Sequence, residues 1–165
     1  MSVVQKISPC LWFDDQAEEA VAFYTSIFAD SRINTTSRYG KAGFEQHHRP
    51  AGSVMTIAFE LDGQAFTALN GGPVFKFNEA VSLQVNCTTQ EEIDYFWDKL
   101  SDGGDPAARQ CGWLKDKYGV SWQIVPQALA EMVADPDPAK ADRVIAALMP
   151  MKKLVIADLN RAYAG

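Results

Sequence analysis

EEAVAFYTSIF (residues 18–28) and EEIDYFWDKLS (residues 91–101) are two copies of one helical pattern, and their repetition decides the fold. A shift of 73 residues lays the first on the second, so that Glu18 meets Glu91. In both copies apolar residues recur at i, i+3, i+4 and i+7, which is typical of a helix packed along one side. We therefore predict one amphipathic helix in each half of an internally duplicated chain.

Each predicted helix has a start signal at the same place. Asp15-x-x-Glu18 and Thr88-x-x-Glu91 are capping-box patterns, in which the first side chain accepts a hydrogen bond from a free backbone N–H of the first turn. We expect Asp15 and Thr88 to cap the two helices.

Short apolar runs surround both helices in the same order. A strand precedes each helix and a hairpin follows it, with an Asp-Gly turn in the first half and Asp-Lys-Tyr-Gly in the second. A weaker strand completes the first half, and residues 105–110 are the candidate for its shorter partner. The expected strands are residues 6–13, 32–39, 53–61 and 64–70, then 80–86, 111–115 and 120–126.

Composition limits the classes of function. Of the 165 residues 47% are apolar and 22% are charged, as in an ordinary globular domain. The net charge of -6 and the lack of a Lys/Arg run argue against a nucleic-acid or membrane partner. No stretch reaches the ~20 apolar residues of a membrane helix, and the first residues lack a signal-peptide pattern. Three cysteines without metal spacing indicate reduced thiols, so we expect a cytoplasmic protein.

The repeat predicts an α+β fold of paired βαβββ modules with a C-terminal helical extension. Each helix should cover one face of its sheet, and the other faces should curve toward a common cleft. In the extension, Asp137-Pro138 marks the start of a helix and Pro150 its end, and LVIADLNRAY predicts one more helix. The expected boundaries are 1–73 and 74–126 for the modules, together residues 1–126, and 127–165 for the extension.

The chain resembles the vicinal oxygen chelate superfamily of glyoxalases, bleomycin-resistance proteins and extradiol dioxygenases. WFDDQAEEAVAFYTSIF, GSVMTIAFELDGQAFTALNGGP, EEIDYFWDKLSDGG and QCGWLKDKYGVSWQIVP are similar to its PhnB-like group, often labelled 3-demethylubiquinone-9 3-methyltransferase. The resemblance implies a glyoxalase/bleomycin-resistance-like fold. The residues give methyl transfer no support, because the glycines lie in hairpins and loops and not in a strand-to-helix turn for S-adenosylmethionine.

The resemblance also implies four positions at which catalytic relatives hold a divalent metal. Those positions correspond here to Pro9, Thr67 or Asn70, Ser82 and Gln123. Divalent sites favour imidazole, carboxylate or thiolate donors, which these side chains do not offer. His47 and His48 lie in a loop between strands. We therefore expect no metal at this site and no other cofactor.

An apolar cleft that carries a few amides suits a small planar or amphipathic organic molecule. Aromatic residues on strands are also typical of a core, and alternation directs Trp122 away from Gln123, toward the helices. The side chains expected to contact the ligand are Gln123, Trp113, Asn70, Thr67, Gln84 and Ser82.

Three other features are weighed as candidate functional elements. Cys111, placed on a strand beside aromatic residues, is either a nucleophile or a small buried hydrophobe. Lys115 and Asp116 are interpreted mainly as solvated turn charges. The loop 40–52 is either a lid over the cleft or a mobile surface loop.

The predicted function is metal-free binding of a small organic ligand by a homodimeric PhnB-like protein. The alternative is an enzyme of the glyoxalase/dioxygenase superfamily, acting through Cys111 or an unusual divalent metal site. A purely structural or interaction module is a third interpretation, which would leave the cleft amides without a purpose.

Overall fold

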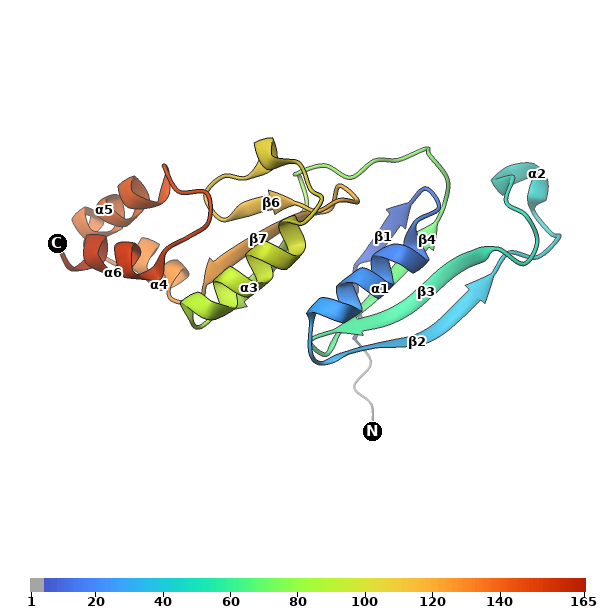
Figure 1. The fold of residues 1–165 in the computed structure, drawn as a ribbon, viewed down its shortest axis with the longest axis horizontal. Coiled ribbons are helices and arrows are strands. Elements are labelled where there is room, and N and C mark those ends of the chain that lie inside the picture. Colours follow the sequence, from blue (N-terminus) through green and yellow to red (C-terminus); the bar gives the residue numbers. More distant parts are fainter. Residues whose placement is uncertain (1–4) are drawn as a thin grey trace. The chain divides into compact units, whose positions relative to one another are not determined.

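The computed structural model describes residues 5–165. The chain forms two compact units that divide between Phe77 and Asn78 (Figure 1). Each unit holds one small sheet with a helix on one face, and the second unit also holds the C-terminal helices. Within the described range no helix is both long and apolar enough to cross a membrane.

The first unit is a four-stranded sheet in the order β1-β4-β3-β2. β1 pairs with β4 in parallel, and β3 is antiparallel to both of its neighbours. The Asp-Gly turn between β3 and β4 is the predicted hairpin, with Asp62 and Gly63 both at positive φ. The elements are β1 (Cys10–Phe13), α1 (Ala17–Ile27), β2 (Ser31–Arg38), α2 (Phe44–His47), β3 (Val54–Leu61) and β4 (Gln64–Asn70).

The core of this unit lies between α1 and one face of the sheet. The helix buries the side predicted by its apolar periodicity, including Val21 and Tyr24. The alternate residues of β3 and β4 bury their side chains in the same layer, and the Phe59 and Phe66 rings stack at 5.4 Å. The other sheet face therefore holds the remaining alternate residues, among them Cys10 and Thr67, which are paired in register.

The second unit repeats this plan with one strand fewer. Its sheet has the order β5-β7-β6, with β5 parallel and β6 antiparallel to β7. α3 packs its buried residues Ile93 and Trp97 on the sheet face that carries Leu114 and Ile124. The elements are β5 (Leu83–Cys87), α3 (Gln90–Ser101), η1 (Pro106–Ala108), β6 (Trp113–Lys115) and β7 (Ser121–Pro126).

The strand expected within residues 105–110 is wrong. Pro106 begins the 3-10 helix η1, and the Asp105 side chain caps it by accepting from the Ala107 N–H at 2.9 Å. Proline has no N–H to donate to a ladder, so this segment cannot extend the sheet as β2 does. Only Gln110 makes an isolated bridge, to Trp113.

The two helix caps differ from the predicted pattern. The N-terminus of α1 has no cap from its own segment; instead Asn70 Oδ1, at the end of β4, accepts from the Ala17 N–H at 2.8 Å. α3 is capped one residue later than expected, because Thr89 accepts from the Glu92 N–H at 3.2 Å. The Glu92 carboxylate in turn accepts from Thr88, and the hydrogen bond from the Thr88 N–H lowers the Glu92 pKa.

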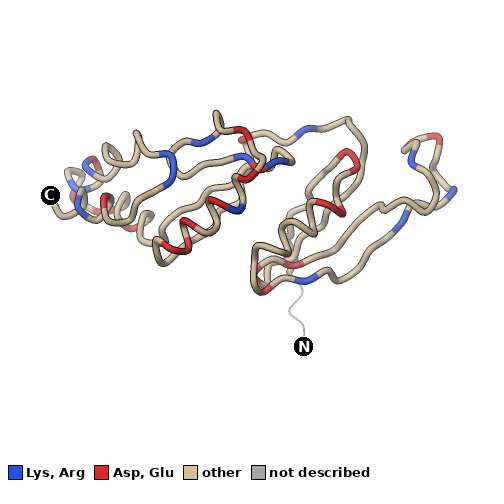
Figure 2. The backbone as a smooth tube through the Cα atoms, in the orientation of Figure 1, with Lys and Arg blue, Asp and Glu red and all other residues tan. Residues whose placement is uncertain are grey.

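The extension is helical, with α4 (Leu129–Val133), α5 (Pro138–Leu148) and α6 (Ile156–Ala164). Asp137 caps α5 and Pro138 occupies its first turn, while the helix ends just before Met149, so both of these predictions are confirmed. The extension has a small core of its own around Val144, Leu154 and Leu159. Figure 1 shows the three helices gathered beyond the end of β7. Lys and Arg are scattered along both units, while acidic residues recur along α1 and α3 (Figure 2).

Candidate functional site

Four of the six predicted ligand-binding residues lie in the second unit. Gln84 of β5 and Trp113 of β6 both pair with Gln123 of β7. Directly paired residues share one face of a sheet, so these three side chains form a row across the face opposite α3. Gln123 Nε2 donates to Ser82 Oγ at 2.8 Å, and Gln84 Nε2 approaches Gln123 Oε1 at 3.4 Å. The structure therefore brings Ser82, Gln84, Gln123 and Trp113 together.

A pocket of about 460 Å³ adjoins this row at Trp113. Its apolar surface comes from Trp113, from Ala108 of η1 and from Met149 at the end of α5. Lys115 of β6 also lines the pocket and forms an ion pair with Glu79. The complete lining is Glu79, Ala108, Gln110, Cys111, Trp113, Leu114, Lys115, Ser121 and Met149.

The Lys115–Glu79 pair is unequally exposed. The Lys115 side chain is 27% exposed and that of Glu79 is 60% exposed. The hydrogen bond from Lys115 lowers the Glu79 pKa, so this carboxylate stays ionised near neutral pH. Lys115 is thus a partly exposed charge whose ammonium is paired and whose stem packs in the pocket wall.

Asp116 differs from the expected solvated charge. It is 3% exposed, and its carboxylate accepts three hydrogen bonds. Oδ1 accepts from the N–H groups of Tyr118 at 2.9 Å and Val120 at 3.0 Å, and Oδ2 accepts from Trp122 Nε1 at 2.8 Å. The Asp-Lys-Tyr-Gly turn is thus built around a buried carboxylate, which holds β6 and β7 in the register that places the site.

Cys111 lies in a two-residue turn and not on a strand, so that part of its assignment is wrong. Gln110 and Trp113 exchange both backbone hydrogen bonds, and the two residues between them, Cys111 and Gly112, have φ of 51 and 82. A Cβ at Gly112 would lie 3.0 Å from Ile124 O, so the turn needs a glycine there.

The Cys111 thiol lines the pocket but has uncharged partners. Sγ lies 3.3 Å from Met149 O and 3.4 Å from Gln110 Nε2. Neither partner is a base that could take the thiol proton, as a nucleophilic cysteine requires. Its catalytic role is untested and remains an alternative.

Thr67 and Asn70 lie in the first unit. Thr67 occupies the sheet face opposite α1, between Cys10 and Ala58. Asn70 is buried on the α1 side, where its amide accepts from Ala17 N–H and donates to Val54 O at 3.2 Å. The Asn70 side chain is therefore used to join α1, β3 and β4.

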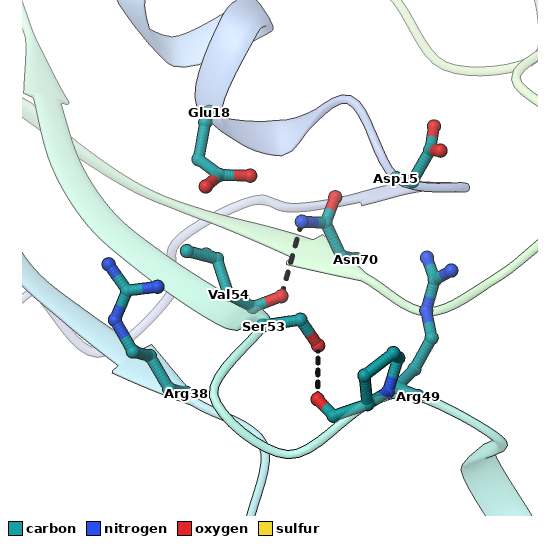
Figure 3. A pocket seen from close by; sticks show the side chains of 8 residues that line it. Asp15, Glu18, Arg38, Arg49, Ser53, Val54 and Asn70 are labelled. Atoms are coloured by element: carbon teal, nitrogen blue, oxygen red, sulfur yellow. Dashed lines mark hydrogen bonds between the residues drawn. The ribbon is translucent and has the colours of Figure 1, made fainter.

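A smaller pocket of about 190 Å³ surrounds the end of β4 in the first unit (Figure 3). Figure 3 shows the Asn70 amide between Glu18 and Val54, with Arg38 and Arg49 at the rim. The neighbouring loop 40–52 contains α2, and the His47 ring lies 4.5 Å from the ring of Tyr39. Arg49 contacts Asp14, so the loop packs on its own unit. Its role as a lid stays a prediction.

The donors at the predicted metal positions do not fit a divalent ion. Pro9 has no side-chain donor, and Ser82 Oγ is engaged by the Gln123 amide. Amide and hydroxyl oxygens alone are weak ligands for transition metals. Within residues 5–165 no three His, Cys, Asp or Glu side chains cluster as a metal site would require.

Two sheets of matching strand order, each with a helix on one face, are the fold of the glyoxalases and bleomycin-resistance proteins of the vicinal oxygen chelate superfamily. Within that class, the family model described as 3-demethylubiquinone-9 3-methyltransferase matches residues 5–125, and the chain belongs to this family. Both the resemblance and the fold class predicted from the sequence are confirmed.

Three solved structures are similar to this chain. A PhnB protein from Bacillus cereus is 39% identical, with a TM-score of 0.64 over 74% of this chain and 99% of the other. PA1353 from Pseudomonas aeruginosa is 18% identical, with a TM-score of 0.56 over 75% and 98%. The fosfomycin resistance protein FosX from Listeria monocytogenes is 16% identical, with a TM-score of 0.50 over 79% and 97%; these last two show the fold alone. No curated protein matches the chain.

Ser121, Met149 and Glu79 are among the pocket residues that sequence reasoning missed. Ser121 has the same strand parity as Gln123, so alternation could have placed it on the same face. Met149 comes from the extension, outside the repeat, and nothing in the sequence indicated that it meets η1 and β6. Glu79 precedes β5 in a turn and carried no signal of its partnership with Lys115.

Proposed function

We propose that this protein binds a small organic ligand, without a metal, on the open sheet face of its second unit. The observation that carries the proposal is the pocket of about 460 Å³ beside the row of Gln84, Gln123 and Trp113. Its size and its combination of apolar walls with few polar groups are typical of small-molecule sites. Trp113 belongs to both the row and the pocket, so we place the ligand against its ring.

A fragment screen by NMR tests this proposal directly. We expect binding fragments to shift the indole N–H signal of Trp113 and the side-chain amide signals of Gln123. Trp113→Ala should weaken binding of the same fragments, while Trp12→Ala, in the other unit, serves as the matched aromatic control. Fragments that bind only elsewhere, with the Trp113 signals unchanged, would refute the location. Native mass spectrometry of the purified protein would reveal a ligand that co-purifies.

The family description supplies a methyl-transfer activity that we do not carry over. Sites for S-adenosylmethionine in alternating α/β folds use a glycine-rich turn between a strand and a helix. The connections from β1 to α1 and from β5 to α3 contain no glycine (Asp14 to Gln16, Thr88 to Thr89). Isothermal titration with S-adenosylmethionine tests this point, and binding at micromolar concentration would contradict it.

The enzymatic alternative, through Cys111 or an unusual divalent metal site, gains no support from the side chains around the pocket. The proposal includes a homodimer, supported by edge strand β2, where Ile33 is 52% exposed, and by an exposed apolar residue of the extension, Ile145. Sedimentation that gives a single 18.2 kDa species at high micromolar concentration would count against it. The cytoplasmic location and the cleft shared by two modules stay predictions.

A further inference from the structure

Ser121 is a buried polar residue of the second unit. It is 2% exposed, and its hydroxyl has no hydrogen-bond partner among the described residues. Buried hydroxyl groups are normally hydrogen-bonded, and an exception asks for an explanation. Ser121 lines the pocket, so a molecule bound there could supply the missing partner.

The residue opposite Ser121 supplies the charge. Ser121 pairs directly with Lys115 across β6 and β7, so the two side chains lie on the same face at neighbouring positions. Lys115 is held in the pocket wall, while its partner Glu79 is mostly exposed and comes from a turn outside the sheet. A carboxylate that enters the pocket could therefore replace that of Glu79 without moving Lys115.

The rest of the pocket defines the body of such a ligand. Trp113 offers an aromatic surface two residues before Lys115 on the same strand face, and Met149 and Ala108 add apolar area. Aromatic rings and thioethers favour contact with a planar ring. A ligand with an anionic group at Lys115 and Ser121 and a flat apolar body at Trp113 thus matches both the charged and the apolar parts of the lining.

We infer that the pocket binds a small aromatic carboxylic acid, whose carboxylate takes the place of Glu79 on Lys115 and accepts a hydrogen bond from Ser121. The inference rests on the proposed function and names the ligand class for the same site. Glu79 then acts as an internal competitor that occupies Lys115 in the free protein. Met149 makes the C-terminal extension part of the binding site, beyond the residues 5–125 matched by the family model.

The test compares 2-naphthoate with 2-naphthamide, which share one shape and differ in charge. Titration calorimetry should show 2-naphthoate binding about 10- to 100-fold more tightly, the range of a charge-assisted hydrogen bond. Lys115→Met should abolish that preference, and Ser121→Ala should weaken 2-naphthoate by about tenfold. Glu79→Gln should strengthen 2-naphthoate several-fold, because an amide competes less well for an ammonium than a carboxylate does. Glu60→Gln, which breaks the Arg32 ion pair of the first unit, is the matched control and should change nothing.

The outcomes separate this inference from the proposed function. Equal binding of both probes with Trp113 signals shifted would overturn the acid preference and leave the site in place. A Glu79→Gln variant that binds 2-naphthoate no more tightly than the unmodified protein would overturn the competitor role. If neither probe binds, the inference is wrong, and the independent fragment screen decides whether the site exists.

Discussion

The strongest structural prediction concerns Asp116, the buried carboxylate that organises the β6–β7 turn. Asp116→Asn keeps the shape of the side chain but leaves only one acceptor oxygen. That oxygen can accept the two backbone N–H groups of Tyr118 and Val120 or the indole N–H of Trp122, but not all three. With the oxygen at the Oδ1 position, the new amide N–H₂ would face the Trp122 N–H, donor against donor.

The size of the effect follows from the hydrogen bonds lost. A hydrogen bond to a charged group contributes about 1.5–3 kcal/mol, and a buried donor left unpaired costs about 1–3 kcal/mol. We therefore expect Asp116→Asn to lower the free energy of unfolding by about 2–3 kcal/mol. Asp102→Asn changes an exposed carboxylate of the same unit, and as the control it should stay within about 0.5 kcal/mol.

A double-mutant cycle with Trp122→Phe isolates the contact. Trp122→Phe removes the indole donor, so the added Asp116→Asn change should cost at least about 1 kcal/mol less than it does alone. Urea unfolding followed by circular dichroism measures the four free energies, and amide hydrogen exchange at Val120 localises the effect to this turn. Two changes that add without coupling, or an Asp116→Asn protein as stable as the original, would refute the account of the turn.

Three further predictions concern other described residues. Gln123→Met should fold normally and lose about tenfold in ligand affinity, roughly one net hydrogen bond, whereas Gln123→Glu should lower stability near neutral pH. Ligand titration and thermal melts compare the two variants. Unchanged binding in the methionine variant would show that Gln123 has a structural role only. Asn70→Leu should lower the free energy of unfolding of the first unit by about 2–4 kcal/mol, because it leaves Ala17 N–H and Val54 O unpaired. Gln16→Ala, at the N-cap position itself, should be near neutral in the same urea titration. Equal effects of the two changes would contradict the role of Asn70 as the cap of α1. Burial raises the pKa of the Cys87 thiol to about 11, above its ordinary 9.0, so its contribution to stability should be intact below pH 9 and lost as the pH rises toward 11. Alkaline unfolding of Cys87→Ala, compared with the original protein, checks this, and identical profiles above pH 9 would disprove it.

The fold could be predicted from the sequence because its signals are local or periodic. The repeated helical pattern located α1 and α3, and the turn residues located both hairpins. The boundaries of α5 followed from Asp137, Pro138 and Pro150, whose effects on the backbone do not depend on distant contacts. Local signals of this kind act on the backbone whatever the tertiary contacts of the rest of the chain.

The details that depend on distant partners could not be predicted. The cap of α1 comes from Asn70, which lies far along the chain from Ala17, so the local Asp15 pattern was misleading. In the sequence Asp116 has the features of an ordinary turn aspartate, and only the structure shows that it accepts a hydrogen bond from the indole of Trp122. Cys111 lies in an apolar segment whose pattern is typical of a strand. The positive φ angles of Cys111 and Gly112, which the sequence does not show, make these two residues a turn.

The C-terminal extension shows why family membership leaves the ligand open. The N–H groups of Cys111 and Gly112 donate to Met151 O and Lys152 O, both at 2.8 Å, and so attach the segment after α5 to the turn beside the pocket. A side chain at Gly112 would crowd this contact, because a Cβ there would lie 3.1 Å from Leu154. This attachment holds the neighbouring Met149 in the pocket wall. Because the family model ends at residue 125, a relative can share every matched residue and still present a different wall to its ligand. The proposed binding site therefore depends on the module and its extension together.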